Sequence, residues 1–194
     1  MKNMSAKFVL KVAGTLTAIA LVVAALLGLV NHITYEKIQE HLMESTMQAL
    51  AKVTPEGATC EPVDLTEDAV AAAKAQGGTL TEMYSVSTGG YACKVEASGS
   101  QGIIEMIVGV DAEGAITGIS VVENAETKGI GSRVMDDDTV ESIGKGVLEQ
   151  FIGLSGAGTL EVNKNITPIT GATVSTRGIT AGANAALAAV ATMG

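Results

Sequence analysis

The sequence predicts an α+β domain, an antiparallel sheet with flanking helices, preceded by one transmembrane helix and a helical stalk. Three observations support this fold class: an uncharged apolar stretch near the N-terminus, short β-branched runs separated by glycine-rich turns, and helical patterns on either side of them. The predicted ranges are 1–11 for a cytoplasmic tail, 12–32 for the transmembrane helix, 33–54 for the stalk and 55–194 for an extracytoplasmic domain.

The membrane-spanning prediction rests on residues 12–35, which contain no Asp, Glu, Lys or Arg. At about 1.5 Å per residue, the apolar run Val12–Val30 reaches roughly 28 Å, the thickness of a bilayer core. The alternative, a cleaved signal peptide, usually has a shorter apolar region and a small-residue cleavage site. Because Lys2, Lys7 and Lys11 precede the span, the positive-inside rule places the N-terminus in the cytoplasm of a single-pass inner-membrane protein.

Charge and residue usage exclude several functions for the body of the chain. The net charge is −9, and the three N-terminal lysines leave −12 on the remainder, which argues against a nucleic-acid partner. The only histidines, His32 and His41, fall at the membrane exit and in the stalk, so the domain has no histidine base and no Ser-His-Asp triad. No zinc-ligand spacing, P-loop or dinucleotide fingerprint occurs. We therefore expect a cofactor to perform any reaction, without a bound metal.

Helical spacing predicts the stalk and one short helix ahead of the sheet. Apolar residues recur every three or four positions through Tyr35–Val53, and Pro55 ends the pattern. A second helix is predicted over Thr66–Gln76, with Thr66 as its N-cap, acidic residues in its first turn and Gly77 after its end.

Four β-strands are predicted in the middle of the chain, because β-branched runs alternate there with glycine-rich turns at intervals typical of hairpins. The strand at Ile103–Val110 is apolar on both faces around Glu105, so we expect it to lie inside the sheet. The predicted strands are Leu80–Thr88, Tyr91–Ala97, Ile103–Val110 and Ile116–Val122.

Two further helices are predicted after the sheet. Apolar spacing favours one over Asp138–Gly153, with the aspartates 136–138 at its positive N-terminal end. A metal site at these aspartates is less favoured, because hard cations usually gather oxygens from alternating loop positions. The other helix, Thr180–Ala191, consists of small residues that allow close approach to a sheet or a ligand.

The two cysteines, Cys60 and Cys93, both lie in the predicted exterior domain. An exterior compartment permits a disulfide between them. Two buried free thiols are the equal alternative, because two cysteines do not make a disulfide framework.

Two segments carry the chemistry-bearing residues. The first, residues 167–176 (TPITGATVST), offers hydroxyls and free N–H groups at a helix start, which is a ready phosphate site; the alternative is that Thr170 or Thr173 only caps the helix. The second, residues 126–131 (ETKGIG), has Gly129 and Gly131 one residue apart, so its backbone can approach a flat ligand; the alternative is a plain loop.

Taken together, ETKGIG some forty residues before TGAT, after a single N-terminal anchor, closely resembles the FMN-binding domain of the G subunit of the Rnf electron-transport complex. The pair is also similar to the C subunit of the sodium-translocating NADH:quinone oxidoreductase. That resemblance implies an FMN whose phosphate a dedicated flavin transferase esterifies to Thr173, within a Ser/Thr-Gly-Ala-Thr-x-Ser/Thr motif.

The resemblance also assigns the neighbouring residues. Thr170 matches the leading hydroxyl, Gly171 and Ala172 the turn, and Ser175 the trailing hydroxyl. The family's ETPGLG loop has Pro where Lys128 stands and Leu where Ile130 stands, and members often carry Asp where Thr167 stands. The loop residues that match are Glu126, Thr127, Gly129 and Gly131.

The implied function is that of an electron carrier in a membrane complex that couples ferredoxin and NAD to ion pumping. Its implied partners are the other membrane subunits, the flavin transferase and the bilayer around residues 12–32. Three alternatives stay open: the quinone-reductase C subunit, a flavin-free exterior interaction or sensor module in which TGAT is a helix cap, and a stand-alone flavoprotein reductase.

Overall fold

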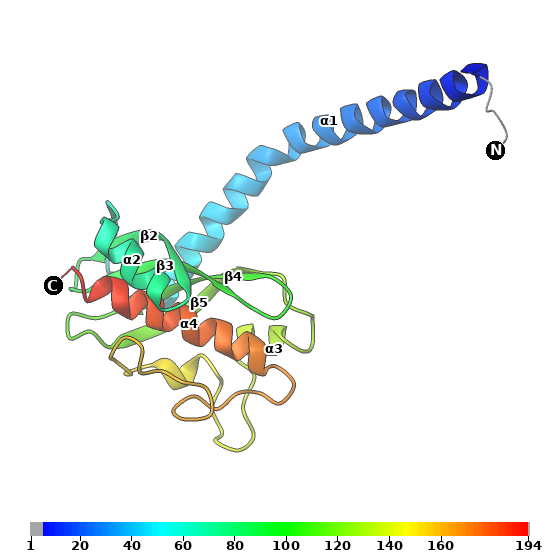
Figure 1. Cartoon of the computed structure of the whole chain (residues 1–194). Helices are drawn as coiled ribbons and strands as arrows, with labels where there is room; N and C mark the ends of the chain where they lie inside the picture. The colour runs from blue at the N-terminus through cyan, green and yellow to red at the C-terminus, as the bar shows by residue number, and fades with distance from the viewer. Residues whose placement is uncertain (1–5, 194) are drawn as a thin grey trace. The chain divides into compact units, whose positions relative to one another are not determined.

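The computed structural model describes residues 6–193 (Figure 1). Lys2 and the rest of the first five residues of the predicted tail lie outside the described residues. The chain divides after Glu44 into an N-terminal helical unit and a larger α+β unit.

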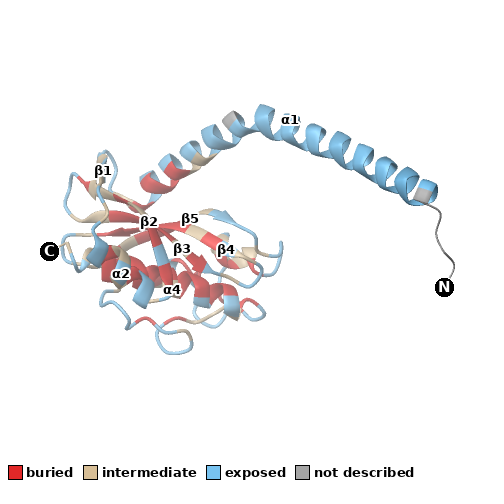
Figure 2. Ribbon diagram, turned by 45° about the horizontal axis from the view of Figure 1, so that its top comes forward, coloured by how far each residue is buried: buried red, intermediate tan, exposed pale blue. Residues whose placement is uncertain are grey.

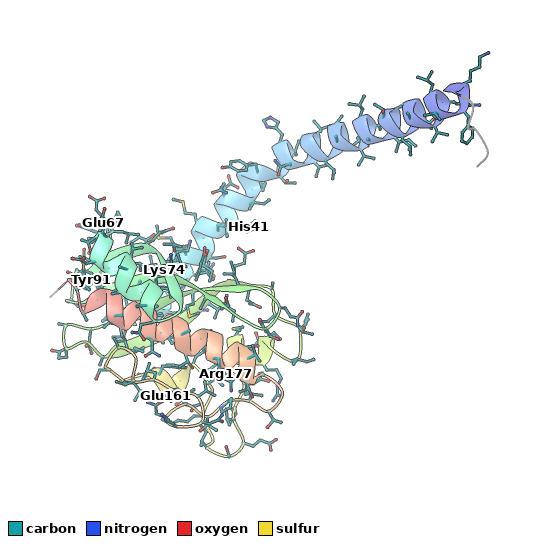
Figure 3. All side chains as sticks on the ribbon, in the orientation of Figure 1. His41, Glu67, Lys74, Tyr91, Glu161 and Arg177 are labelled. Atoms are coloured by element: carbon teal, nitrogen blue, oxygen red, sulfur yellow. The ribbon has the colours of Figure 1, made fainter. Side chains whose placement is uncertain are left out.

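The N-terminal unit consists of the greater part of helix α1 (Ala6–Val53), which covers both the predicted transmembrane helix and the predicted stalk. Within the described residues, α1 is the one helix long and apolar enough to cross a membrane. Its apolar side chains are exposed along the segment 8–35, as Figure 2 shows. His41, labelled in Figure 3, is also exposed and has Glu44 as its nearest acidic neighbour.

The larger unit is built on one five-stranded antiparallel sheet in the order β1-β2-β3-β4-β5, so the α+β prediction is confirmed. The sheet is a simple meander in which each strand pairs with the next one in the chain. The strand over Ile103–Val110 lies between two neighbours, as its two apolar faces predicted. The first strand was not predicted, because it has only four residues and includes a proline. The strands are β1 (Cys60–Val63), β2 (Gly78–Val86), β3 (Tyr91–Ser98), β4 (Ile103–Val110) and β5 (Ile116–Asn124).

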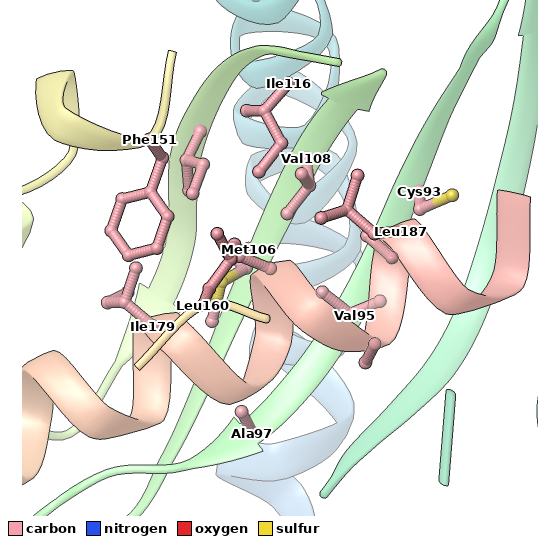
Figure 4. Close-up of a cluster of buried hydrophobic side chains, with 14 of the residues drawn as sticks. Cys93, Val95, Ala97, Met106, Val108, Ile116, Phe151, Leu160, Ile179 and Leu187 are labelled. Atoms are coloured by element: carbon pink, nitrogen blue, oxygen red, sulfur yellow. The ribbon is translucent and has the colours of Figure 1, made fainter. Parts of the chain in front are cut away.

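Helices α2 (Glu67–Ala75) and α4 (Thr173–Val190) cover one face of the sheet and enclose the main core. Figure 4 shows part of this core, in which Phe151 and Ile179 lie near Met106. The predicted cap of α2 is confirmed, because the hydroxyl of Thr66 accepts a hydrogen bond from Ala69 N at 3.2 Å.

Helix α4 begins at Thr173, seven residues earlier than its predicted start at Thr180. Gly178 precedes the predicted start, yet it lies within the helix. A Cβ on Gly178 would come within 2.7 Å of the carbonyl oxygen of Ser98. The missing side chain thus lets the helix rest directly on the end of β3, and packing outweighs the low helix propensity of glycine.

The last turns of α1 cover the other face of the sheet. Ala49, Leu50 and Val53 pack there in a smaller core with residues of β2, β3 and β4. The hydroxyl of Thr117 donates a hydrogen bond of 2.5 Å to Val53 O. A Cβ on Gly109 would lie 2.4 Å from the same carbonyl oxygen, so this glycine admits the helix end against the sheet.

The helix predicted over Asp138–Gly153 is wrong. The segment forms turns, an isolated bridge between Val140 and Lys145, and only a single 3₁₀ turn, η1 (Glu149–Phe151). Gly144 has a positive φ of 68°, which no regular helix accommodates, and Asp137 accepts a hydrogen bond from Leu148 N at 2.7 Å. The apolar pattern was still partly informative, because its members Val140, Val147 and Phe151 are buried, whereas Ile143 is exposed.

The aspartates 136–138 therefore do not begin a helix, and the dipole prediction for them is also wrong. They follow a short helix that was not predicted, α3 (Ser132–Met135), for which Asp136 is the C-cap. Arg133, within that helix, instead pairs with Asp138 at 2.9 Å.

The segment after η1 covers part of the outer edge of β5. Ile116 N donates to Leu154 O and Gly153 N donates to Ile116 O, both at 2.8 Å. A bridge between Ala115 and Ser155 extends this pairing by one residue. The irregular segment thus satisfies backbone groups at the start of an edge strand.

Both cysteines are free thiols, so the disulfide alternative is wrong; Cys93 is buried as the other alternative stated, whereas Cys60 is half-buried. Cys60 lies on β1 beside the smaller core, whereas Cys93 lies on β3 in the main core, and β2 runs between them. Two strand spacings amount to roughly 10 Å, beyond the Cα separation that a disulfide can bridge. Burial raises the pKa of the Cys93 thiol to about 12.

Candidate functional site

The structure brings the loop 126–131 and the start of α4 into direct contact. Ser175, in the first turn of α4, donates a hydrogen bond of 2.5 Å from its hydroxyl to Glu126 Oε2, across 49 positions of sequence. The other carboxylate oxygen, Glu126 Oε1, accepts from the backbone N of Ser100 at 2.6 Å and of Gln101 at 3.1 Å. One carboxylate therefore joins three segments of the chain.

The meander places these segments together. The turn 99–102 joins β3 to β4. Because β5 runs antiparallel to β4, the last residues of β5 lie at the same end of the sheet as this turn. Glu126 follows β5 by two residues, and its N–H donates to Asn124 Oδ1 at 3.1 Å. The sequence predicted the segment 99–102 only as a glycine-rich turn between two strands. No motif in it indicated the contact with Glu126.

Gly131 is required by the chain itself. A Cβ at this position would lie 2.2 Å from Glu126 Oε2 and 2.8 Å from Ser175 Oγ. The φ of Gly131 is −68°, which any residue can adopt. Space, not backbone freedom, selects glycine here, and the neighbour that fills the space is Glu126. The sequence had suggested a ligand in that place.

Gly129 differs from Gly131. Its φ is +76°, a conformation that favours glycine, and no atom of the described chain lies within 4 Å of where its Cβ would be. Its N–H donates to the hydroxyl of Ser132 at 2.9 Å. Gly129 thus turns the loop, and its open side faces away from the rest of the chain.

Helix α4 starts without a side-chain cap. Its N-cap residue is Ala172, preceded by Gly171 at a φ of +87°, and no side-chain oxygen bonds to the first turn. The first N–H to bond back within the helix is that of Thr176, to Ala172 O at 3.0 Å. Among the hydrogen bonds of residues 6–193, none engages the N–H groups at 173–175. Neither Thr170 nor Thr173 acts as the cap, so the capping alternative does not describe this helix.

Thr173 is the first residue of α4 and is half-buried. Ala172 and Ser175 are buried on either side of it, whereas Thr170, Gly171 and Thr127 are exposed. No hydrogen bond within the described part of the chain engages the hydroxyl of Thr173. The geometry offers a half-buried, unengaged hydroxyl at the positive end of an 18-residue helix.

Apolar side chains are exposed on the two segments that meet here. Ile130, next to Gly131, is 53% exposed, and Val174, next to Thr173, is 50% exposed. Since Gly131 and Ser175 are in contact, these two side chains project from adjoining segments. An exposed β-branched pair beside an anion-attracting helix end suits a ligand that has a phosphate and an apolar part.

The electrostatics around the first turn of α4 favour an anion. That turn contains no acidic residue, and Arg177, labelled in Figure 3, is exposed one turn further on. The carboxylate of Glu126 is the nearest acid in contact with the turn, and three hydrogen-bond donors already offset it. The described residues hold no group of three or more His, Cys, Asp or Glu that could bind a metal ion.

Other surface hollows lie away from this site. One of about 600 Å³ is lined by Tyr91, Val110, Leu187, Val190 and Met193, at the C-terminal end of α4 and so at the opposite end of that helix from Thr173. Its acidic members, Asp111 and Glu113, belong to a turn in which Asp111 accepts from two backbone N–H groups. This hollow therefore does not coincide with the candidate site residues, which lie at the start of α4.

Comparisons with known proteins identify an FMN-binding domain in this part of the chain. Residues 99–188 match the family model described as FMN-binding domain, a range that begins at the turn in contact with Glu126 and includes nearly all of α4. Residues 1–53 match the model described as RnfG N-terminal region, which ends where α1 ends.

Whole-chain relatives give a consistent result. The chain is 31% identical over 186 residues to the G subunit of the Na(+)-translocating ferredoxin:NAD(+) oxidoreductase complex of Acetobacterium woodii, covering 92% of this chain and 89% of the relative. It is 29% identical over 182 residues to the G subunit of the ion-translocating oxidoreductase complex of Methanosarcina acetivorans, covering 89% of each chain. A third relative, the G subunit of the same kind of complex from Shewanella loihica, is 29% identical over 141 residues, which are 65% of this chain and 62% of the relative.

Proposed function

We propose, from the premise that this chain belongs to the RnfG family of ion-translocating ferredoxin:NAD oxidoreductase subunits, that it carries electrons through one FMN esterified to Thr173. The family and its FMN-binding domain are the established part of this statement. The covalent bond, its position and the side of the membrane are the proposal.

The observation that carries the proposal is the uncapped start of α4 at Thr173. Three unengaged N–H groups and the helix dipole can receive the charge of a phosphodiester, and the adjoining hydroxyl is free to form the ester. A helix with a side-chain cap would have used the same donors internally. The flavin-free alternative loses its structural basis, because it required TGAT to be that cap.

The residues around Thr173 fit the cofactor. FMN supplies the electron transfer itself, so the protein needs only to bind, orient and shield it. Ile130 and Val174 can contact the apolar part of the ring, and Gly171, Ala172 and Gly129 shape the turns on either side. Arg177 adds a positive charge one turn from the phosphate position. A covalent tether keeps the carrier from being lost by dissociation into the exterior medium.

The setting follows from α1 and from the family. The complex is membrane-bound, and we propose that residues 12–32 cross the bilayer once, with the N-terminus in the cytoplasm and the FMN domain outside. The proposed partners are the other membrane subunits of the Rnf complex and, during maturation, a flavin transferase. The three G-subunit relatives favour this assignment over the quinone-reductase C subunit, and the subunits that co-purify with the chain distinguish the two.

The test is Thr173→Ala in the full chain, co-expressed with the transferase. Wild type should gain the mass of FMN less one water, and Thr173→Ala should lack it and be colourless. Thr170→Ala should reduce attachment without abolishing it, because Thr170 only shapes the turn. Ser175→Ala should also leave some attachment, because Ser175 holds the turn in place and is not the ester oxygen. FMN that persists on Thr173→Ala after denaturation would move the site, with Ser175 or Thr176 the next hydroxyls.

A further inference from the structure

The carboxylate of Glu126 has a role that a contact with the cofactor does not explain. Both of its oxygens are engaged within the chain, Oε1 by two backbone N–H groups and Oε2 by the hydroxyl of Ser175. We propose that Glu126 is a positioning residue, which fixes the first turn of α4 so that Thr173 is presented for flavin attachment. This inference rests on the proposed function, because attachment at Thr173 is the event that Glu126 would control.

The space around the carboxylate supports a role within the chain. A Cβ on Gly99 would lie 2.3 Å from Glu126 Oε1, and a Cβ on Gly131 would lie 2.2 Å from Oε2. Two backbone segments thus close on the carboxylate from two sides, each through a glycine. The Glu126 carboxylate, enclosed in this way by its own chain, is suited to join the turn 99–102 to the first turn of α4.

The contact reaches Thr173 through the geometry of a helix. Ser175 is 1% exposed and lies two residues after Thr173, within the same turn. Holding the Ser175 hydroxyl fixes the rotation of that turn about the helix axis. It therefore fixes the direction of the Thr173 hydroxyl and of the free N–H groups relative to the loop that bears Ile130. Without it, the uncapped first turn of α4 keeps only the local bond from the Thr176 hydroxyl to Ala172 O, and no side-chain hydrogen bond joins the turn to another segment.

Substitutions can separate the effect of the Glu126 charge from the effect of the contacts that its side chain makes. Glutamine has nearly the shape of glutamate, its oxygen can accept from the turn 99–102, and its amide can donate to the hydroxyl of Ser175, which accepts as well as donates. Glu126→Gln therefore removes the charge but keeps the three-way contact, whereas Glu126→Ala removes both. Glu123→Ala is a matched control, because it removes an exposed glutamate three residues earlier on β5.

The experiment measures the fraction of full-length chain that carries the FMN mass over time, in membranes from cells co-expressing the transferase. Glu126→Gln should stay within about twofold of wild type, and Glu126→Ala should be slower by about tenfold or more, because small misplacements of a reacting group cost that much. Ser175→Ala should be slowed like Glu126→Ala, and the double variant should be no slower than either single one, because both remove the same contact. Glu123→Ala should match wild type.

Each outcome decides one question. Glu126→Ala labelled at the wild-type rate would overturn the inference, and so would Glu126→Gln as slow as Glu126→Ala, because the charge would then matter and not the position. Effects that multiply in the double variant would also overturn it. If Glu126→Ala does not accumulate as folded protein, Ser175→Ala alone decides, since it removes one hydroxyl. Wild type without FMN would instead refute the proposed function.

Discussion

Gly131→Ala tests the arrangement around Glu126 without substituting Glu126 or Thr173. The φ of Gly131 is −68°, so alanine costs no backbone strain there, and its side chain is small. The added Cβ would lie 2.2 Å from Glu126 Oε2, so the carboxylate has to move away. A glutamate end can move easily, and the cost is therefore the contacts that it leaves.

The magnitude follows from those contacts. Hydrogen bonds to charged groups contribute about 1.5–3 kcal/mol each when buried, and Glu126 is only half-buried, so partial loss of its three bonds should cost about 2 kcal/mol. For a domain of this size, that corresponds to a fall in Tm of about 4–8 °C. Flavin attachment should slow along with it, because the first turn of α4 loses the same contact.

The measurement is thermal unfolding of the full chain in detergent, followed by circular dichroism, with the flavin-bound fraction determined by intact mass. Gly118→Ala is the matched control, because its Cβ would find its nearest atom at an ordinary 3.4 Å, and it should change stability by less than about 1 kcal/mol. A Gly131→Ala protein with wild-type stability and wild-type attachment would refute the contact between Glu126 and Ser175.

Four further predictions concern the rest of the molecule. Alkylation of the denatured chain without reductant should label two thiols, whereas the native chain at pH 8 should keep Cys93 unlabelled, because burial raises its pKa to about 12. Since the folded pKa of that thiol lies above its ordinary value of 9.0, its contribution to stability should be complete below pH 9 and should be lost as the pH rises toward 12, which unfolding titrations can follow. Gly109→Ala should destabilise by about 2 kcal/mol or more in thermal unfolding, because its Cβ would meet the backbone oxygen of Val53 at 2.4 Å and a carbonyl yields less readily than a side chain. Protease added to spheroplasts should digest epitopes after the apolar span and spare an N-terminal tag, and digestion of the tag instead would reverse the proposed orientation.

Much of the fold was predictable because its signals are local. Hydrophobic alternation and glycine turns located four of the five strands, and the cap of α2 followed from Thr66 alone. The helix prediction for 138–153 was wrong because turns can bury residues at the same apolar spacing as a helix. Val140 and Phe151 reach the core from turns that Gly144 makes possible.

The candidate site was predictable as two segments and not as one contact. TGAT and ETKGIG carried enough pattern to be singled out, yet nothing in either indicates that Glu126 would bond to Ser175 or to the turn 99–102. That contact depends on the order of the strands, which brings the turn between β3 and β4 and the last residues of β5 to the same end of the sheet. The reason for Gly131 was likewise hidden, because a glycine in sequence does not show which neighbour takes its space.

The irregular segment after η1 affects how copies of this domain can associate at a membrane surface. Anchored proteins diffuse in two dimensions, where identical domains meet often and with similar orientations. An open sheet edge would then invite strand pairing between copies. Here the start of β5 is already paired through Ile116 with residues 153 and 154, and the opposite edge, β1, is four residues long and contains Pro62. One edge of the described sheet is short and contains a proline, and the other is covered at its start, so fewer free backbone groups are exposed to strand pairing between crowded copies.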